Sequence, residues 1–193
     1  FVRYAGAAGD FNPVHHDDEY ARKLGFPSVF AMGMYPVGLL GSYVSQWLGP
    51  QRVAQLDVRF VSPSWPSDVL LLSAEPESDG RAKLFVTAAG ALRISGAVSF
   101  DGAALDRSSP PPEPQEPRLR KMLDTVLTPI ELPVERGKIL EFSRATGAAG
   151  VHTDLGKAKA AGFADLLAPP TFTNVAAHWF SGDATEIPLA VGL

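Results

Sequence analysis

Cysteine is absent from the 193 residues of this chain, and other features that would mark a specialised protein are missing too. Without cysteine the chain has no disulfides, no thiolate nucleophile and no cysteine ligand for zinc. Basic residues do not exceed acidic ones, and the net charge of -4 gives no electrostatic basis for binding nucleic acid. No run of about 18 apolar residues occurs, so we expect neither a membrane span nor a membrane partner.

What remains is the composition of an ordinary globular protein. Hydrophobic residues make up 46% of the chain and charged residues 20%, which is enough apolar surface for a sizeable core. No basic-then-apolar secretory leader can be read in the sequence, although its first residue is Phe1 rather than Met. Together with the missing cysteine, this favours a cytoplasmic location.

The first hundred residues place helix signals before strand signals. We expect a helix to end near residue 8, a short helix at 16–24 and a longer, largely apolar helix from Gly33 to Leu48. Strands are predicted at 53–61, 69–74 and 83–100, the last with a break near Gly90. A mostly apolar helix followed by antiparallel strands indicates an α+β fold, in which a sheet wraps around a buried helix.

Residues 9–15 carry the densest set of groups that could do chemistry, and they read Gly-Asp-Phe-Asn-Pro-Val-His. Asp and Asn side chains accept hydrogen bonds from backbone amides two residues on, and Pro13 keeps Asn12 out of helical geometry. The resulting bend can bring Asp10 and His15 to one side, as a carboxylate and an imidazole available for proton transfer. From these residues alone, an active-site loop and a solvated connector are equally good interpretations.

Further motifs follow this loop in order. Leu-Gly-Phe stands at 24–26, Ala-Met-Gly-Met at 31–34, Asp-Val-Arg-Phe at 57–60 and Pro-Ser-Asp at 66–68. With the loop, this series resembles the signature of the MaoC-like, (R)-specific enoyl-thioester hydratases and dehydratases, a family with the hotdog fold. Met32 and Ser67 depart from the family pattern, which usually has His and Gly at these places.

The resemblance implies both a fold and a site. The fold is a hotdog, an antiparallel sheet wrapped around a long central helix. The site has Asp10 and His15 as an acid/base pair, Asn12 orienting the water or fixing the loop, and the Gly33 backbone N–H stabilising an enolate oxygen at the helix N-terminus. The implied reaction is reversible hydration of trans-2-enoyl thioesters to (R)-3-hydroxyacyl thioesters, which needs no metal and no organic cofactor.

Two neighbours of the pair receive simpler interpretations. His16 is a second imidazole beside His15, but the family spacing assigns the catalytic role to His15, so His16 is expected at the surface or behind the site. Tyr4 matches a family position as well, and we interpret it as a packing residue because aromatics near helix ends are usually buried in cores.

A proline-rich segment at 101–118 is predicted to be an extended linker that forms no core. It separates a catalytic hotdog at 1–100 from a second unit at 119–193. The second unit begins with an amphipathic helix predicted at 135–146.

The second unit repeats the first in reduced form. His152 and the Ala-Gly-Phe at 161–163 follow His15 and the Leu-Gly-Phe by 137 positions, which indicates a duplicated domain. The loop at 147–152 has lost the Asp, Asn and Pro, and a lone His152 has no acid partner. We therefore predict a double hotdog whose second copy is incomplete and non-catalytic.

Three functions stay open from the sequence. The first is the hydratase or dehydratase, with an acyl-CoA or acyl-carrier-protein thioester as substrate. The second is a hotdog acyl-thioesterase, which normally uses a lone carboxylate. The third is a non-catalytic acyl-binding subunit of a dehydratase complex. For all three we expect a homodimer, or a heterodimer with another hotdog subunit.

Overall fold

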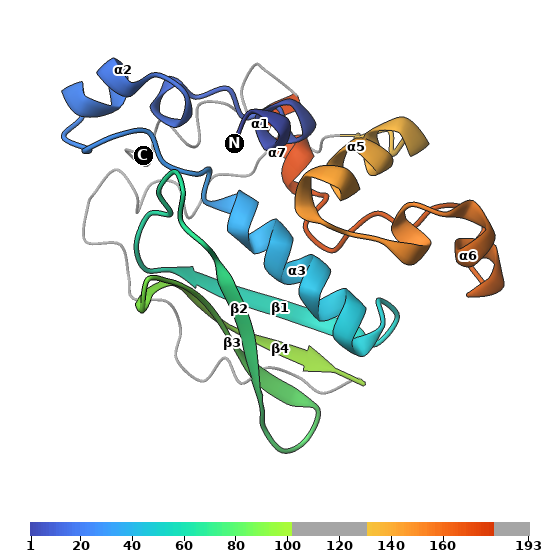
Figure 1. The fold of residues 1–193 in the computed structure, drawn as a ribbon. Coiled ribbons are helices and arrows are strands. Elements are labelled where there is room, and N and C mark those ends of the chain that lie inside the picture. The colour runs from blue at the N-terminus through green and yellow to red at the C-terminus, as the bar shows by residue number, and fades with distance from the viewer. Residues whose placement is uncertain (102–130, 180–193) are drawn as a thin grey trace, which may run out of the picture.

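A long helix packed on an antiparallel sheet forms the first half of the chain (Figure 1). The computed structural model describes residues 1–101 and 131–179. Helix α3 (Met34–Leu48) lies along one face of a four-stranded sheet with the order β1-β4-β3-β2. The strands are β1 (Val53–Phe60), β2 (Leu71–Pro76), β3 (Arg81–Ala88) and β4 (Ala91–Phe100). The predicted α+β hotdog arrangement is confirmed.

The spacing of apolar residues explains why α3 lies on the sheet. Val37, Leu40, Val44 and Leu48 recur at intervals of three or four residues, so they share one side of the helix and are all buried. They pack against inward-facing strand residues, namely Ala82, Leu84, Val86, Ile94 and Val98. This core fixes the position of the N-terminal end of α3, where Gly33 lies.

The predicted strands agree with the structure except at some ends. The expected break near Gly90 is a turn in which Ala89 and Gly90 both have positive φ, 49° and 78°. The strand predicted from Val69 begins two residues later, at Leu71. The reason is that β3 ends with Ala88 at this turn, and Leu71 pairs with Thr87, so little of β3 remains for earlier residues to pair with.

Short helices cover the N-terminal end of α3. Helix α1 (Val2–Ala8) ends at Gly9, whose φ of 80° is the left-handed conformation that glycine adopts without strain. Helix α2 (Asp18–Lys23) begins after Asp17, whose carboxylate accepts hydrogen bonds from two backbone amides of the first turn. Both helices agree with the sequence prediction to within two residues. Among the described helices, none combines the length and hydropathy needed to cross a bilayer.

The second unit repeats this order of helices. Helix α5 (Arg136–Thr146) ends at Gly147 with φ 69°, as α1 ends at Gly9. A 3-10 turn, α6 (Leu155–Ala160) and α7 (Asn174–Trp179) follow, and residues 131–179 contain no strand. The predicted linker lies outside the described residues apart from Asp101, so the domain boundaries stay predictions.

A second hydrophobic core joins the two halves. Tyr4 and Ala8 of α1 pack with Phe142 of α5, and the cluster extends to Phe172 and Val175 of the C-terminal part. Beside this core α3 approaches α5 closely at Gly38, where a Cβ would lie 2.6 Å from the Thr146 Cγ2. The absence of a side chain at Gly38 therefore permits this contact between the halves.

We expect Gly38→Ala to lower the free energy of unfolding by about 2 kcal/mol, because the new methyl group overpacks the contact with Thr146. Thr146→Ser in the same chain removes Cγ2 but keeps the hydroxyl that donates to the Phe142 carbonyl, so it should restore part of the loss. Urea denaturation measures both. Equal stability of Gly38→Ala and the parent chain would contradict the close approach.

Candidate active site

The loop between α1 and α2 is held by its own side chains. The backbone amide of Asn12 donates to Oδ1 of Asp10 at 3.3 Å, and the amide of Val14 donates to Oδ1 of Asn12 at 3.1 Å. Pro13 starts a 3-10 turn, η1 (Pro13–His15). These are the hydrogen bonds expected from Asp and Asn two residues before an amide, and they give the bend its shape.

The bend brings Asp10 and His15 together, five residues apart in sequence. Oδ2 of Asp10 lies 3.8 Å from Nε2 of His15, and the two side chains are 16% and 10% exposed. This separation is too long for a direct hydrogen bond, but one small molecule can contact both groups. The arrangement offers a carboxylate and an imidazole in one partly buried place, as proton transfer requires.

The imidazole of His15 is oriented by a backbone carbonyl. Its Nδ1 lies 2.8 Å from the carbonyl oxygen of Phe30, and a carbonyl only accepts hydrogen bonds. Nδ1 therefore carries a proton, and in the neutral ring Nε2 is left as the acceptor that faces Asp10. The Phe30 ring packs edge-on against the imidazole at 5.1 Å between centroids. The structure thus fixes both the direction and the tautomer of His15.

Behind Phe30 lies a support that the sequence reasoning missed. The Phe30 ring packs against Trp65, whose backbone amide donates to Oδ2 of Asp68 at 2.9 Å. The same carboxylate oxygen pairs with Nη2 of Arg93 at 3.0 Å, and both side chains are mostly buried. The Pro-Ser-Asp motif marked the turn at Asp68. Arg93 lies far along the chain in β4, so no local sequence signal indicates this pairing.

Gly33, the predicted oxyanion residue, directly precedes α3. It is exposed, and its amide donates no hydrogen bond within the described part of the chain. A Cβ at this position would lie 3.1 Å from the ring of Phe60, so this aromatic side chain lies directly beside the helix N-terminus. The chain from Phe30 to Gly33 links this amide to the carbonyl that holds His15.

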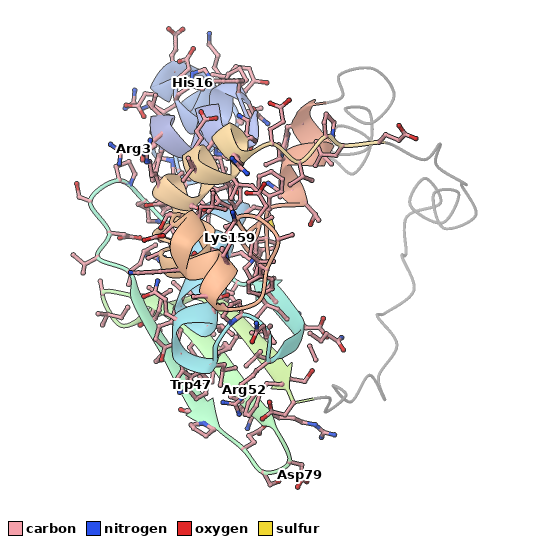
Figure 2. All side chains as sticks on the ribbon, turned by 90° about the vertical axis from the view of Figure 1, so that its right-hand side faces the viewer. Arg3, His16, Trp47, Arg52, Asp79 and Lys159 are labelled. Atoms are coloured by element: carbon pink, nitrogen blue, oxygen red, sulfur yellow. The ribbon has the colours of Figure 1, made fainter. Side chains whose placement is uncertain are left out.

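His16 lies at the surface, which is one of the two places expected for it. Its Nε2 lies 3.1 Å from the carbonyl oxygen of Phe11, and the residue is exposed. Figure 2 shows it at the opposite end of the molecule from Asp79, which lies in the turn between β2 and β3. His16 is therefore not part of the acid/base pair.

Tyr4 is buried, as a packing residue should be, but its hydroxyl has a partner that the sequence did not reveal. Nδ2 of Asn174, the first residue of α7, donates to this hydroxyl at 3.2 Å. Burial raises the pKa of Tyr4 well above its usual value, the hydrogen bond from Asn174 lowers it, and the Asp10 carboxylate raises it again. The hydroxyl therefore stays protonated and lies within electrostatic reach of Asp10.

The second loop keeps the histidine contact without the acid. Nδ1 of His152 lies 2.7 Å from the Leu167 carbonyl oxygen, repeating the contact of His15 with Phe30 at the same separation in sequence. Nε2 of His152 is buried and has no hydrogen-bond partner among residues 1–101 and 131–179. No carboxylate forms an ion pair with His152 in the described ranges, which is the arrangement predicted for a silent copy.

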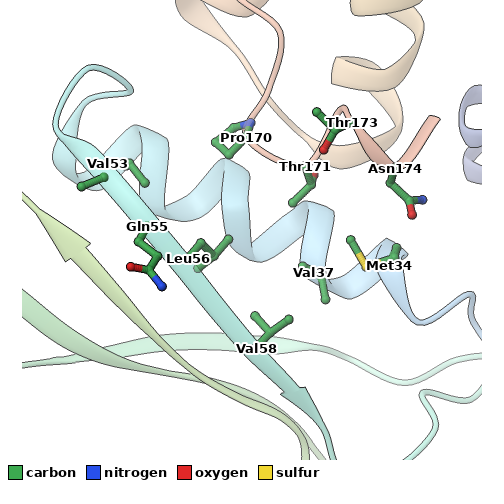
Figure 3. Close-up of a pocket in the computed structure, with 11 residues that line it drawn as sticks. Met34, Val37, Val53, Gln55, Leu56, Val58, Pro170, Thr171, Thr173 and Asn174 are labelled. Carbon is green, nitrogen blue, oxygen red and sulfur yellow. The ribbon is translucent and has the colours of Figure 1, made fainter. Parts of the chain in front are cut away.

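A pocket of about 550 Å³ lies between α3, β1 and residues 170–174 of the second half (Figure 3). Met34 and Val37 form one wall, and Thr171 and Asn174 form another. Neither Asp10 nor His15 lines it. Within the described residues no cluster of three or more His, Asp or Glu side chains could hold a metal ion.

Two family models match separate parts of the chain. Residues 1–91 match the family model of the MaoC like domain, and residues 122–190 match that of the FAS1-like, dehydratase domain region. A UPF0336 protein of Streptomyces avermitilis is 34% identical over 92 residues, which cover 47% of this chain and 50% of that protein. The chain therefore spans about half the length of this relative.

Two further proteins extend the comparison. The peroxisomal hydratase-dehydrogenase-epimerase of Saccharomyces cerevisiae is 33% identical over 67 residues, which cover 35% of this chain and 7% of that protein. The crystal structure of a MaoC domain protein dehydratase from Chloroflexus aurantiacus has a TM-score of 0.60 at 14% identity, covering 98% of this chain and 66% of that one. The latter likeness shows the fold.

The hydrogen bonds of the two neighbouring histidines predict opposite tautomers. We expect neutral His15 to carry its proton on Nδ1, because the Phe30 carbonyl accepts there, and neutral His16 to carry it on Nε2, because the Phe11 carbonyl accepts there. Long-range ¹H–¹⁵N NMR spectra above the titration range distinguish the two, with His16→Gln used for assignment. An Nε2-protonated His15 would contradict the orientation described for the site.

Proposed function

Because residues 1–91 of this chain belong to the MaoC-like domain family, we propose that the Asp10–His15 site catalyses the reversible hydration of trans-2-enoyl thioesters to (R)-3-hydroxyacyl thioesters. The observation that carries the proposal is the acceptor nitrogen of His15 facing the Asp10 carboxylate at 3.8 Å. A loop of fixed shape and an anchored imidazole hold this pair, so the two groups are oriented before substrate binds.

The pair supplies both proton transfers. In hydration a water molecule held by Asp10 and His15 loses a proton to the pair while its oxygen bonds to C3 of the enoyl thioester. The electrons of the double bond move toward the thioester carbonyl, giving an enolate. The proton taken from the water is then delivered to C2 from the same side, which restores the pair. Dehydration follows the same steps in reverse.

Gly33 and Asn12 complete the proposed site. Gly33 is exposed at the N-terminus of α3, and its N–H has no acceptor among the described residues, so this N–H and the helix dipole favour negative charge on the enolate oxygen. The family resemblance implies one of two roles for Asn12, which are to orient the water or to fix the loop. Its Oδ1 accepts the Val14 amide, and this contact favours the loop-fixing role.

We propose an acyl-CoA or acyl-carrier-protein thioester as substrate and a second hotdog subunit as partner, in a homodimer or heterodimer. Exposed apolar side chains near the site support such a partner. Phe11 follows Asp10 and is 65% exposed, while Phe60 and Val61 at the end of β1 are 54% and 49% exposed. Apolar side chains with this exposure are typical of surfaces that another subunit covers.

Asp10→Asn and His15→Ala should each lower kcat for hydration of crotonyl-CoA by about 10² to 10⁴-fold, because each removes one partner of the acid/base pair. The fall in absorbance of the conjugated enoyl thioester measures hydration, and chiral chromatography identifies the (R)-product. His16→Gln is the matched control and should keep the parent rate, because His16 faces away from the pair. Full activity in both site variants would rule out this pair.

The same assay separates the other two functions. A thioesterase would release free thiol from a saturated acyl thioester and leave the conjugated absorbance of an enoyl thioester unchanged. A non-catalytic subunit would bind acyl thioester tightly without turnover, with or without a partner subunit. The paired imidazole favours the hydratase, because a hotdog thioesterase normally needs only the carboxylate.

A further inference from the structure

The position of Asp10 depends on helix α1. The helix spans Val2–Ala8, Gly9 ends it, and Asp10 follows directly. The Gly9 amide bonds to the carbonyl of Ala5, so the start of the loop is continuous with the helix. Any contact that prevents α1 from rotating about its axis or shifting along it therefore also fixes the backbone of Asp10.

Tyr4 has the largest buried side chain of α1 and contacts both halves of the molecule. It is 1% exposed, and its ring packs at 5.4 Å from Tyr35 and at 5.8 Å from Phe142, measured between centroids. Its hydroxyl accepts the hydrogen bond from Asn174. Of these three partners only Tyr35 belongs to the first half of the chain. Phe142 and Asn174 come from α5 and α7 of the second half.

The hydrogen bond from Asn174 to the Tyr4 hydroxyl needs a polar partner, whereas the contacts of the Tyr4 ring do not. A buried hydroxyl without a partner costs about 1–3 kcal/mol, so the Asn174 amide satisfies a group that apolar neighbours cannot. Because the Asn174 amide is the donor, the Tyr4 hydroxyl oxygen is the acceptor, and the hydroxyl hydrogen does not point toward Asn174. Asn174 lines the pocket in Figure 3 together with Met34 at the start of α3.

We propose that Tyr4 and Asn174 form a positioning pair through which the second half of the chain holds Asp10 opposite His15. The inference deepens the proposed function and depends on it for the catalytic role of Asp10. In this way the second half of the chain, which lacks the acid, helps to position the site of the first half. Neither Tyr4 nor Asn174 takes a proton in the reaction. Both act through α1.

Three variants test the pair: Tyr4→Phe, which keeps the ring and removes the hydroxyl, Asn174→Leu, which keeps the size and removes the donor, and the double variant. Each single variant should lower kcat for crotonyl-CoA about tenfold with KM unchanged, because Asp10 is displaced and substrate binding is not. The double variant should be no slower than the singles, since both remove one interaction. Additive losses, or losses confined to KM, overturn the proposal.

Gln46→Ala is the matched control. The Gln46 side-chain amide also joins the halves, donating to the Gly147 carbonyl at 3.1 Å, but it projects from α3 and not from α1. This variant should keep kcat even where thermal unfolding shows a similar loss of stability. A drop in kcat equal to that of Asn174→Leu would mean that general loosening between the halves, and not the Tyr4 contact, controls the site.

A second measurement does not depend on turnover. The ring NMR signals of His15, which faces the Asp10 carboxylate, should shift in Tyr4→Phe and in Asn174→Leu and stay unchanged in Gln46→Ala. Unchanged His15 signals in both variants overturn the positioning pair. A parent chain that hydrates no enoyl thioester would instead count against the proposed function, and the His15 signals would then still decide whether the pair positions this loop.

Discussion

The candidate site depends on one hydrogen bond, from Nδ1 of His15 to the carbonyl oxygen of Phe30. This contact joins the loop after α1 to the segment that leads into α3. It therefore fixes the position of the imidazole relative to the N-terminus of α3. It also decides which ring nitrogen faces Asp10. Phe30 is braced in turn by Trp65, which the Asp68–Arg93 ion pair attaches to the sheet. The geometry of the candidate site is thus anchored to the sheet through Arg93 of β4.

The two halves of the chain contribute unequally. The first carries the sheet, the central helix and both titrating groups of the proposed reaction. The second contributes helices that pack against α1 and α3, at contacts as close as that of Thr146 with Gly38. Helix α1, which leads into the Asp10 loop, therefore packs against a repeat that has no acid at the corresponding loop.

Local chemistry explains what the sequence could predict. The bend from Asp10 to His15 follows from side-chain hydrogen bonds over two residues, and the buried face of α3 follows from its apolar spacing. Contacts distant in sequence could not be read in the same way. Arg93 and Asp68 come together only in the folded chain, and Tyr4 and Asn174 stand 170 positions apart. Ser67 adopts a φ of 70°, a glycine conformation at the position where the family pattern usually has Gly.

His152 shows what happens to a catalytic residue type once its chemistry is gone. Its ring still contacts the Leu167 carbonyl and so joins the turn before α6 to the segment after this helix, while its second nitrogen is buried. Both imidazoles thus make a structural contact with a backbone carbonyl, and His15 has a carboxylate beside it as well. The contact with the backbone carbonyl is present in both loops, with a carboxylate beside the ring in the first and with none in the described part of the second. A histidine at this position is therefore accounted for by the fold alone, and the carboxylate five residues before it is what distinguishes the first loop from the second.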